Sequence, residues 1–102
     1  MKQVLITGSS RGIGAATALY FAQKNFNIVI NYVSNKEAAD NLSREINAKY
    51  PVDTLVIKAD VSNESEVINM LQLTKERFGR VDILINNAGI AIDTTLEDKT
   101  VD

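Results

Sequence analysis

Short apolar runs alternate with longer helical patterns along the whole chain, and this alternation limits the folds open to it. The apolar runs are rich in Val, Ile and Leu and are bounded by Gly, Asn, Asp or Pro, which is typical of strands. The segments between them carry apolar residues at helical spacing. The predicted strands cover 3–7, 27–32, 54–59 and 81–86, and the predicted helices cover 12–24, 34–50 and 62–78.

The order of these elements predicts an α/β fold with a doubly wound parallel sheet of Rossmann type. Helical crossovers between buried apolar strands place the strands parallel and the helices on both faces. Right-handed connections and a reversal after the third strand give the spatial order 3-2-1-4 for the pattern β-α-β-α-β-α-β. The 102 residues are therefore expected to form one domain, equal to half of a doubly wound nucleotide-binding fold plus one strand.

Two of the three predicted helices have local start and stop signals, and the first has a predicted buried face. Ser34-x-x-Glu37 has the form of a capping box, and that helix should end before Pro51. Ser62 or Asn63 can cap the last helix, which Gly79 should end. For the first helix, the spacing places these residues on the buried face: Ile13, Ala16, Thr17, Tyr20 and Phe21.

Composition excludes several classes of site and partner. The chain has no Cys and no His, which excludes disulfides, thiol nucleophiles, Ser-His-Asp triads and metal sites built on those residues. The net charge of −2 gives no basic surface for nucleic acid. Its longest apolar runs are about five residues, far below the ~18 needed to cross a membrane. With no signal peptide visible, we expect a cytoplasmic protein without a metal or a membrane partner.

The most informative motif is a glycine-rich turn, Gly8 to Gly14, between the first strand and the first helix. Its spacing is Gly-x-x-x-Gly-x-Gly. Glycines allow a sharp turn and let a ligand approach the backbone, and the helix start that follows offers free N–H groups and a positive dipole end. Glycine also occurs in turns for geometry alone, but the strand–turn–helix context favours a pyrophosphate site.

The end of the second strand favours NADP over NAD. NAD-binding proteins usually place an acidic residue there to bind the ribose 2′-hydroxyl. The region 27–34 has no carboxylate, and the first acidic residue of the chain is Glu37. Arg11 lies inside the glycine turn, where a guanidinium can pair with a 2′-phosphate. The alternative is that Arg11 is a solvated loop cation.

Two further motifs follow strands that end at the same edge of the sheet. Asn86-Asn87-Ala88-Gly89 follows the fourth strand, where small residues let a ring or ribose lie against the backbone and Asn amides can link neighbouring strands. Asp60-Val61 follows the third strand. Asp60 is placed to reach an adenine amino group, or it only begins the turn into the third helix.

Together these motifs resemble the short-chain dehydrogenase/reductase family over essentially the whole chain. Three segments are most similar in sequence to the 3-oxoacyl-[acyl-carrier-protein] reductase branch of that family, namely Gly8 to Gly14, Val81-Asp82-Ile83-Leu84 and Gly89-Ile90. The resemblance implies an NADP(H)-dependent oxidoreductase, a homo-oligomer acting on a small-molecule or acyl-thioester carbonyl. It implies cofactor contacts from Gly8, Ser9, Ser10, Arg11, Gly12, Ile13 and Gly14 (phosphates and adenosine side), from Asn31, Tyr32 and Ser34 (2′-phosphate), from Asp60 and Val61 (adenine), and from Asn87, Ala88 and Gly89 (nicotinamide ribose).

No catalytic residue is assigned in this chain. Carbonyl reduction needs a proton donor and stabilisation of the alkoxide, which the resembled family supplies from a Ser, an Asn and a Tyr-x-x-x-Lys pair beyond the Asn-Asn-Ala-Gly motif. Two pairs share that spacing, Tyr20 with Lys24 and Tyr32 with Lys36. We reject both, because Tyr20 is expected in the core, with Lys24 at the exposed helix end, and the second pair spans a strand end and a helix cap.

Two functions remain as hypotheses. The first is the cofactor-binding half of an NADPH-dependent reductase, which alone binds a dinucleotide but reduces nothing. The second is a non-catalytic NADP-binding or interaction module that joins other chains through edge strand 81–86. A generic Rossmann-type domain for another nucleotide is disfavoured by the Asn-Asn-Ala-Gly motif.

The predicted edge strand 81–86 generates a first test. An unpaired apolar parallel edge, with one helix on its face of the sheet, leaves apolar surface exposed. We therefore expect the isolated 102-residue chain to self-associate or misfold, as measured by analytical ultracentrifugation across a concentration series. A monodisperse monomer that melts cooperatively in dilute solution would contradict this expectation.

Overall fold

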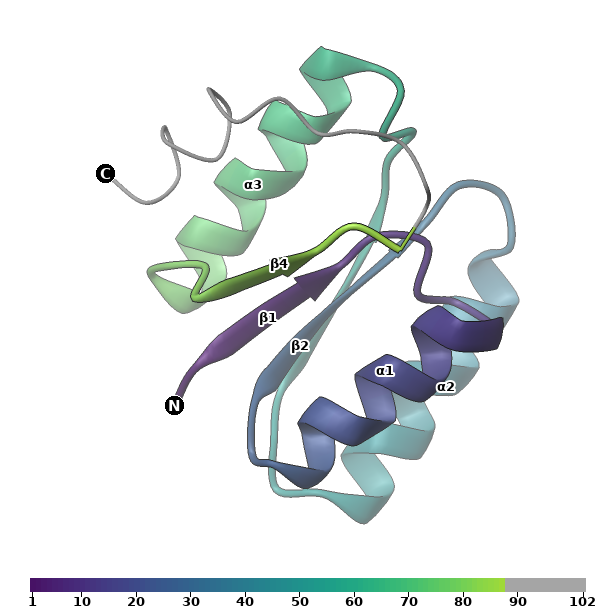
Figure 1. Cartoon of the computed structure of the whole chain (residues 1–102), viewed down its shortest axis with the longest axis vertical. Coiled ribbons are helices and arrows are strands. Elements are labelled where there is room, and N and C mark those ends of the chain that lie inside the picture. Colours follow the sequence, from purple (N-terminus) through teal and green to yellow (C-terminus); the bar gives the residue numbers. More distant parts are fainter. Residues whose placement is uncertain (88–102) are drawn as a thin grey trace.

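A computed structural model, described here for residues 1–87, shows the parallel sheet that the sequence predicts. The four strands lie in the order β3-β2-β1-β4, with helices α1 and α2 on one face and α3 on the other (Figure 1). The elements in chain order are β1 (Gln3–Ile6), α1 (Gly12–Gln23), β2 (Asn27–Tyr32), α2 (Lys36–Lys49), β3 (Thr54–Lys58), α3 (Glu64–Phe78) and β4 (Ile83–Ile85).

The sheet separates two apolar cores because successive strand side chains point to opposite faces. In β1, Val4 and Ile6 pack toward α1 and α2, whereas Leu5 packs toward α3. In β2, Ile28 and Ile30 join the first core and Val29 the second. All of these strand residues are fully buried, which explains why the strands read as continuous apolar runs.

A polar network at the amino ends of the strands fixes their register. The Gln3 N–H donates to Asp82 Oδ2 at 2.8 Å, and the Asn27 amide donates to Gln3 Oε1 at 3.0 Å. Asn27 Oδ1 in turn accepts from the Asp53 N–H at 2.9 Å, and Arg77 forms an ion pair with Asp53 at 2.6 Å. This network links all four strands and α3 at the edge of the sheet opposite the glycine turn.

Helix α1 buries a different face from the one predicted. Gly14, Ala18 and Ala22 face the sheet, while Ile13 is 78% exposed and Tyr20 is 55% exposed, so the prediction that Tyr20 is a core residue is wrong. The helix is apolar on every side, so the period of its apolar residues does not select a face. The small residues lie inward because they let α1 pack closely against the strands.

The predicted cap of α2 is also wrong by one residue, and β4 is shorter than predicted. Asn35, not Ser34, precedes the first turn, and its Oδ1 accepts from the Ala38 N–H at 3.0 Å. Asn63, one of the two predicted cap residues, caps α3, and Gly79 ends it as predicted with a φ of +87°. Strand β4 covers three residues rather than the six of 81–86.

The cap position generates a prediction about stability. Replacing Asn35 by Ala removes the side-chain acceptor and should lower the free energy of unfolding by about 1 kcal/mol. The matched variant Ser34→Ala should change it by less than about 0.5 kcal/mol. Urea denaturation followed by circular dichroism measures both, and equal losses would contradict the assignment of the cap to Asn35.

Candidate functional site: the turn between β1 and α1

The candidate site lies where the carboxyl ends of the parallel strands meet, beside the point at which the strand order reverses. In open α/β sheets ligands bind at this edge. A cavity of about 350 Å³ opens there between the turn after β1 and the turn after β2. Its lining residues are Gly8, Ser10, Arg11, Tyr32, Val33, Ser34 and Asn35.

This lining brings together five residues that the sequence singles out, namely Gly8, Ser10, Arg11, Tyr32 and Ser34. Val33 and Asn35 also line the cavity but are not among the residues predicted from the sequence. Val33 is 51% exposed although it directly follows β2. Its position next to Tyr32, a predicted site residue, was the signal in the sequence that could have identified it. An exposed apolar side chain at a strand end offers a flat contact for a ring.

The electrostatics of the cavity favour an anion. Among its seven lining residues, Arg11 carries the one charged side chain. No carboxylate within residues 1–87 lies at ion-pair distance from that guanidinium. An arginine without an acidic partner at a cavity mouth can bind a phosphate with two parallel hydrogen bonds.

The amino end of α1 offers a second attraction for negative charge. Arg11 precedes the helix in an extended conformation, but no side chain caps the helix, and its first turn contains no acidic residue. By contrast, Asn35 and Asn63 cap α2 and α3, whose first turns contain glutamates. The free N–H groups and the helix dipole at the start of α1 therefore suit a phosphate group.

Gly14 allows the helix to approach the turn closely. A Cβ atom at this position would lie 2.7 Å from Asn87 Nδ2 and closer still to the carbonyl oxygen of Gly8. Asn87 donates a hydrogen bond from Nδ2 to that same oxygen at 3.2 Å. Asn87 thus links the end of β4 to the glycine turn that follows β1, which is the kind of link between neighbouring strands that the sequence predicts.

Ser9 and Asn31 do not have the positions that the sequence suggested. Both side chains are fully buried, so neither is exposed to the cavity, and this burial disfavours the predicted contact of Asn31 with a 2′-phosphate. Asn31 lies in the ladder between β1 and β3, where it pairs with Ile57. Ser9 Oγ accepts from the Asn31 N–H at 3.0 Å beneath the turn.

The remaining predicted residues lie around this turn or beyond the part of the chain that is described. Gly12 and Ile13 are exposed in the first turn of α1. Asn87 contacts Gly8, whereas Ala88 and Gly89 fall outside residues 1–87.

Asp60 and Val61 follow β3 at the same edge of the sheet. Val61 is 7% exposed, and Asp60 is exposed. Asp60 Oδ1 accepts from the Ser62 hydroxyl at 2.6 Å and from the Ser62 N–H at 3.0 Å, so Asp60 does begin the turn into α3. These two hydrogen bonds lower the pKa of the Asp60 carboxyl, and the bond from the Ser62 hydroxyl has the larger effect. Asp60 is therefore ionised at neutral pH.

Neither Tyr-x-x-x-Lys pair forms a proton-donating pair in this structure. The Lys24 ammonium lies 5.4 Å from the centre of the exposed Tyr20 ring, on the outer surface of α1. Tyr32 is 8% exposed, and Lys36 forms an ion pair with Asp40 at 2.7 Å. Within residues 1–87 there is also no group of three acidic, His or Cys side chains that would hold a metal ion.

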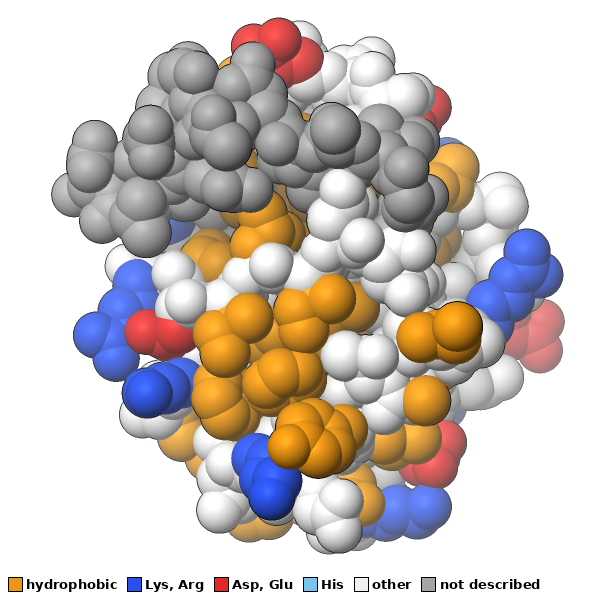
Figure 2. All heavy atoms as spheres, in the orientation of Figure 1, with side chains coloured by type: hydrophobic (Ala, Val, Ile, Leu, Met, Phe, Trp, Pro, Cys, Tyr) orange, Lys and Arg blue, Asp and Glu red, His pale blue; other side chains and the backbone are white. Residues whose placement is uncertain are grey.

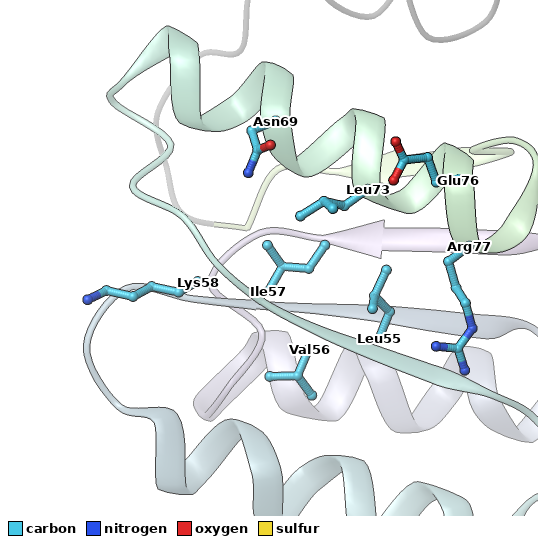
Figure 3. A pocket seen from close by; sticks show the side chains of 8 residues that line it. All are labelled: Leu55, Val56, Ile57, Lys58, Asn69, Leu73, Glu76 and Arg77. Carbon is cyan, nitrogen blue, oxygen red and sulfur yellow. The ribbon is translucent and has the colours of Figure 1, made fainter.

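A second hollow, of about 520 Å³, lies at the outer edge of the sheet between β3 and α3 (Figure 3). Leu55 and Ile57 point from the strand toward Leu73 of the helix, and Arg77 lies at one end (Figure 3). None of the predicted cofactor residues lines it, and it does not lie at the reversal of strand order. The cavity at the glycine turn is therefore the better candidate.

Comparison with known proteins identifies relatives of this chain. The sequence profile of the short chain dehydrogenase family matches residues 2–102. The 3-oxoacyl-[acyl-carrier-protein] reductase FabG of Staphylococcus aureus is 43% identical over 95 residues, which are 93% of this chain and 38% of that protein. The 3-oxoacyl-[acyl-carrier-protein] reductase of Synechocystis is 44% identical over 92 residues, or 90% of this chain and 37% of that protein.

A solved structure supports the same relationship. A crystal structure described as a short-chain dehydrogenase/reductase of Burkholderia xenovorans superposes with a TM-score of 0.82 at 34% identity. It covers 85% of this chain and 36% of the other. The chain therefore spans less than two fifths of the length of the relatives it matches.

The close approach at Gly14 generates a prediction. Gly14→Ala places a methyl group against the backbone of Gly8 and Ser9 and should lower the free energy of unfolding by about 3 kcal/mol. Gly12→Ala is the control, because no atom lies within 4 Å of a Cβ there, although its φ of +63° should still cost about 1 kcal/mol. Chemical denaturation measures both, and a Gly14 variant as stable as the Gly12 variant would contradict the close approach.

Proposed function

Since the chain belongs to the short-chain dehydrogenase family, we propose that it is the cofactor-binding part of an NADPH-dependent oxidoreductase. The substrate class we propose is a carbonyl compound, with 3-oxoacyl thioesters favoured by the names of its relatives. The observation that carries the proposal is the cavity lined by Arg11, which has no acidic partner within residues 1–87 and which directly precedes the uncapped start of α1. We propose a homo-oligomer of the cytoplasm on the same resemblance.

The residues of the cavity fit a dinucleotide with a 2′-phosphate. The pyrophosphate would lie against the backbone of Gly8 to Gly14 and the amino end of α1, where no side chain caps the first turn of the helix. Arg11 would bind the 2′-phosphate, with Ser34 and the polar tip of Tyr32 beside it. A cavity lined by a carboxylate would repel that group, and this lining has none.

The other contacts of the proposed cofactor follow the edge of the sheet. Asp60, exposed and ionised after β3, would accept from the adenine amino group through its second oxygen. Asn87, Ala88 and Gly89 would line the nicotinamide ribose. When bound, NADPH supplies the hydride for carbonyl reduction, and this chain's described residues bind and orient the cofactor.

A second function is favoured by the position of β4. This strand is at the end of the described sheet, and Ile83, Leu84 and Ile85 are only partly buried. Figure 2 shows apolar side chains gathered on the visible face between β4 and α1, and the partly buried residues Ile83, Ile85, Ala15 and Leu19 all pack against the core beneath α1 and α2. The alternative proposal is therefore an NADP-binding module that joins other chains through the segment 81–86.

The role of Arg11 is tested by its effect on two cofactors. Arg11→Ala removes the charge that would bind the 2′-phosphate, so the Kd for NADPH should rise about tenfold or more, while that for NADH changes less than about twofold. Nucleotide fluorescence titration measures both constants.

Lys24→Ala is the matched control, because Lys24 is an exposed cation at the other end of the same helix. It should leave both constants unchanged. Equal weakening of NADPH and NADH by Arg11→Ala would contradict the assignment of the 2′-phosphate to Arg11.

A further inference from the structure

Asn31 is a fully buried polar residue at the carboxyl end of β2, in the interior of the sheet. The strand is flanked by β1 on one side and by β3 on the other. Burying an amide without partners costs a few kcal/mol, so the bonds that it makes show what holds it there.

The acceptor atom of this amide is directed at the glycine turn. Asn31 Oδ1 accepts from the Gly8 N–H at 2.9 Å, and the Asn31 backbone exchanges two further hydrogen bonds with Ser9, each at 3.0 Å. Gly8 has a φ of +60°, a backbone conformation that residues other than glycine rarely adopt. The first residue of the turn is therefore fixed from beneath by Asn31 and, through its carbonyl oxygen, by Asn87 at 3.2 Å.

The donor atom of the same amide is directed at the next strand. Asn31 Nδ2 donates to the Ala59 carbonyl at 3.0 Å and lies 3.4 Å from the Ile57 carbonyl. Ala59 directly precedes Asp60, which stands at the adenine side of the proposed site. A carboxylate at position 31 would lack this donor, and a leucine would lack both functions, so the position needs an amide.

We propose that Asn31 is a positioning residue for the dinucleotide, because it joins the turn that would hold the pyrophosphate to the edge of β3 that would hold the adenine. This inference rests on the proposed function. Asn31 has no exposed surface, so its side chain would not touch the 2′-phosphate. It acts on the part of the site that NADPH and NADH share, so its loss weakens both cofactors by the same factor.

The chain contains a matched control on the same strand. Asn27, at the amino end of β2, donates to Gln3 Oε1 at 3.0 Å and accepts from the Asp53 N–H at 2.9 Å. It thus joins the same three strands with the same chemistry, at the opposite edge of the sheet. A purely structural role at position 31 would make the two asparagines equivalent in cofactor binding.

The test compares Asn31→Ala and Asn27→Ala in the full chain, with Kd values for NADPH and NADH measured at a temperature where both variants are folded. Asn31→Ala should raise both constants by the same factor, about fivefold to tenfold, because the glycine turn loses the hydrogen bond that holds the Gly8 N–H. Asn27→Ala should change them less than about twofold. A loss confined to NADPH, or equal changes in the two variants, would overturn the role of Asn31.

A measurement on the unaltered chain covers the case in which Asn31→Ala does not fold. Hydrogen exchange by NMR, without nucleotide, should show a protected Gly8 amide, since Asn31 already holds it. A Gly8 amide that exchanges as fast as an exposed loop amide would overturn the inference alone. A native chain that binds neither NADPH nor NADH would overturn the proposed function and this inference with it.

Discussion

The hydrogen bonds that Asn31 and Asn87 make to Gly8 are the constraint on which the site depends. They come from the strands on either side of β1 and hold both the N–H and the carbonyl of one glycine. With the Asn31 bond to Ala59, they connect the carboxyl ends of all four strands. A turn held in this way loses little conformational entropy when an anion binds, which favours tight binding.

A second amide network lies at the opposite edge of the sheet. It stabilises the fold, whereas the network around Asn31 holds the turn of the proposed site. At the amino ends, Gln3, Asn27 and Asp53 fix the register of the strands, and Arg77 connects this network to α3. At the carboxyl ends, Asn31 holds the N–H of Gly8, and no side-chain hydrogen bond caps the first turn of α1. The cation of Arg11 and the free N–H groups at the start of α1 therefore lie at one cavity, beside the glycine turn that Gly14 lets the helix approach closely.

Much of the fold was predictable because its signals are local. Continuous apolar runs identified the strands, and helical spacing with Gly-rich turns gave the parallel order 3-2-1-4. The buried face of α1 was not predictable, since apolar residues surround that helix and only packing against the sheet selects Gly14, Ala18 and Ala22. The role of Asn31 was not predictable either, because its partners lie 23 to 28 residues away in the chain. A polar residue at a strand end looks the same in sequence whether it faces a ligand or a neighbouring strand.

The measurement that tests this account most directly is a crystal structure of the chain grown with NADPH. The account predicts the pyrophosphate against residues 8–14 at the start of α1, the 2′-phosphate at the Arg11 guanidinium, and Asn31 unmoved beneath Gly8. A dinucleotide bound elsewhere, for example in the hollow between β3 and α3, or a glycine turn rebuilt around it, would contradict the account.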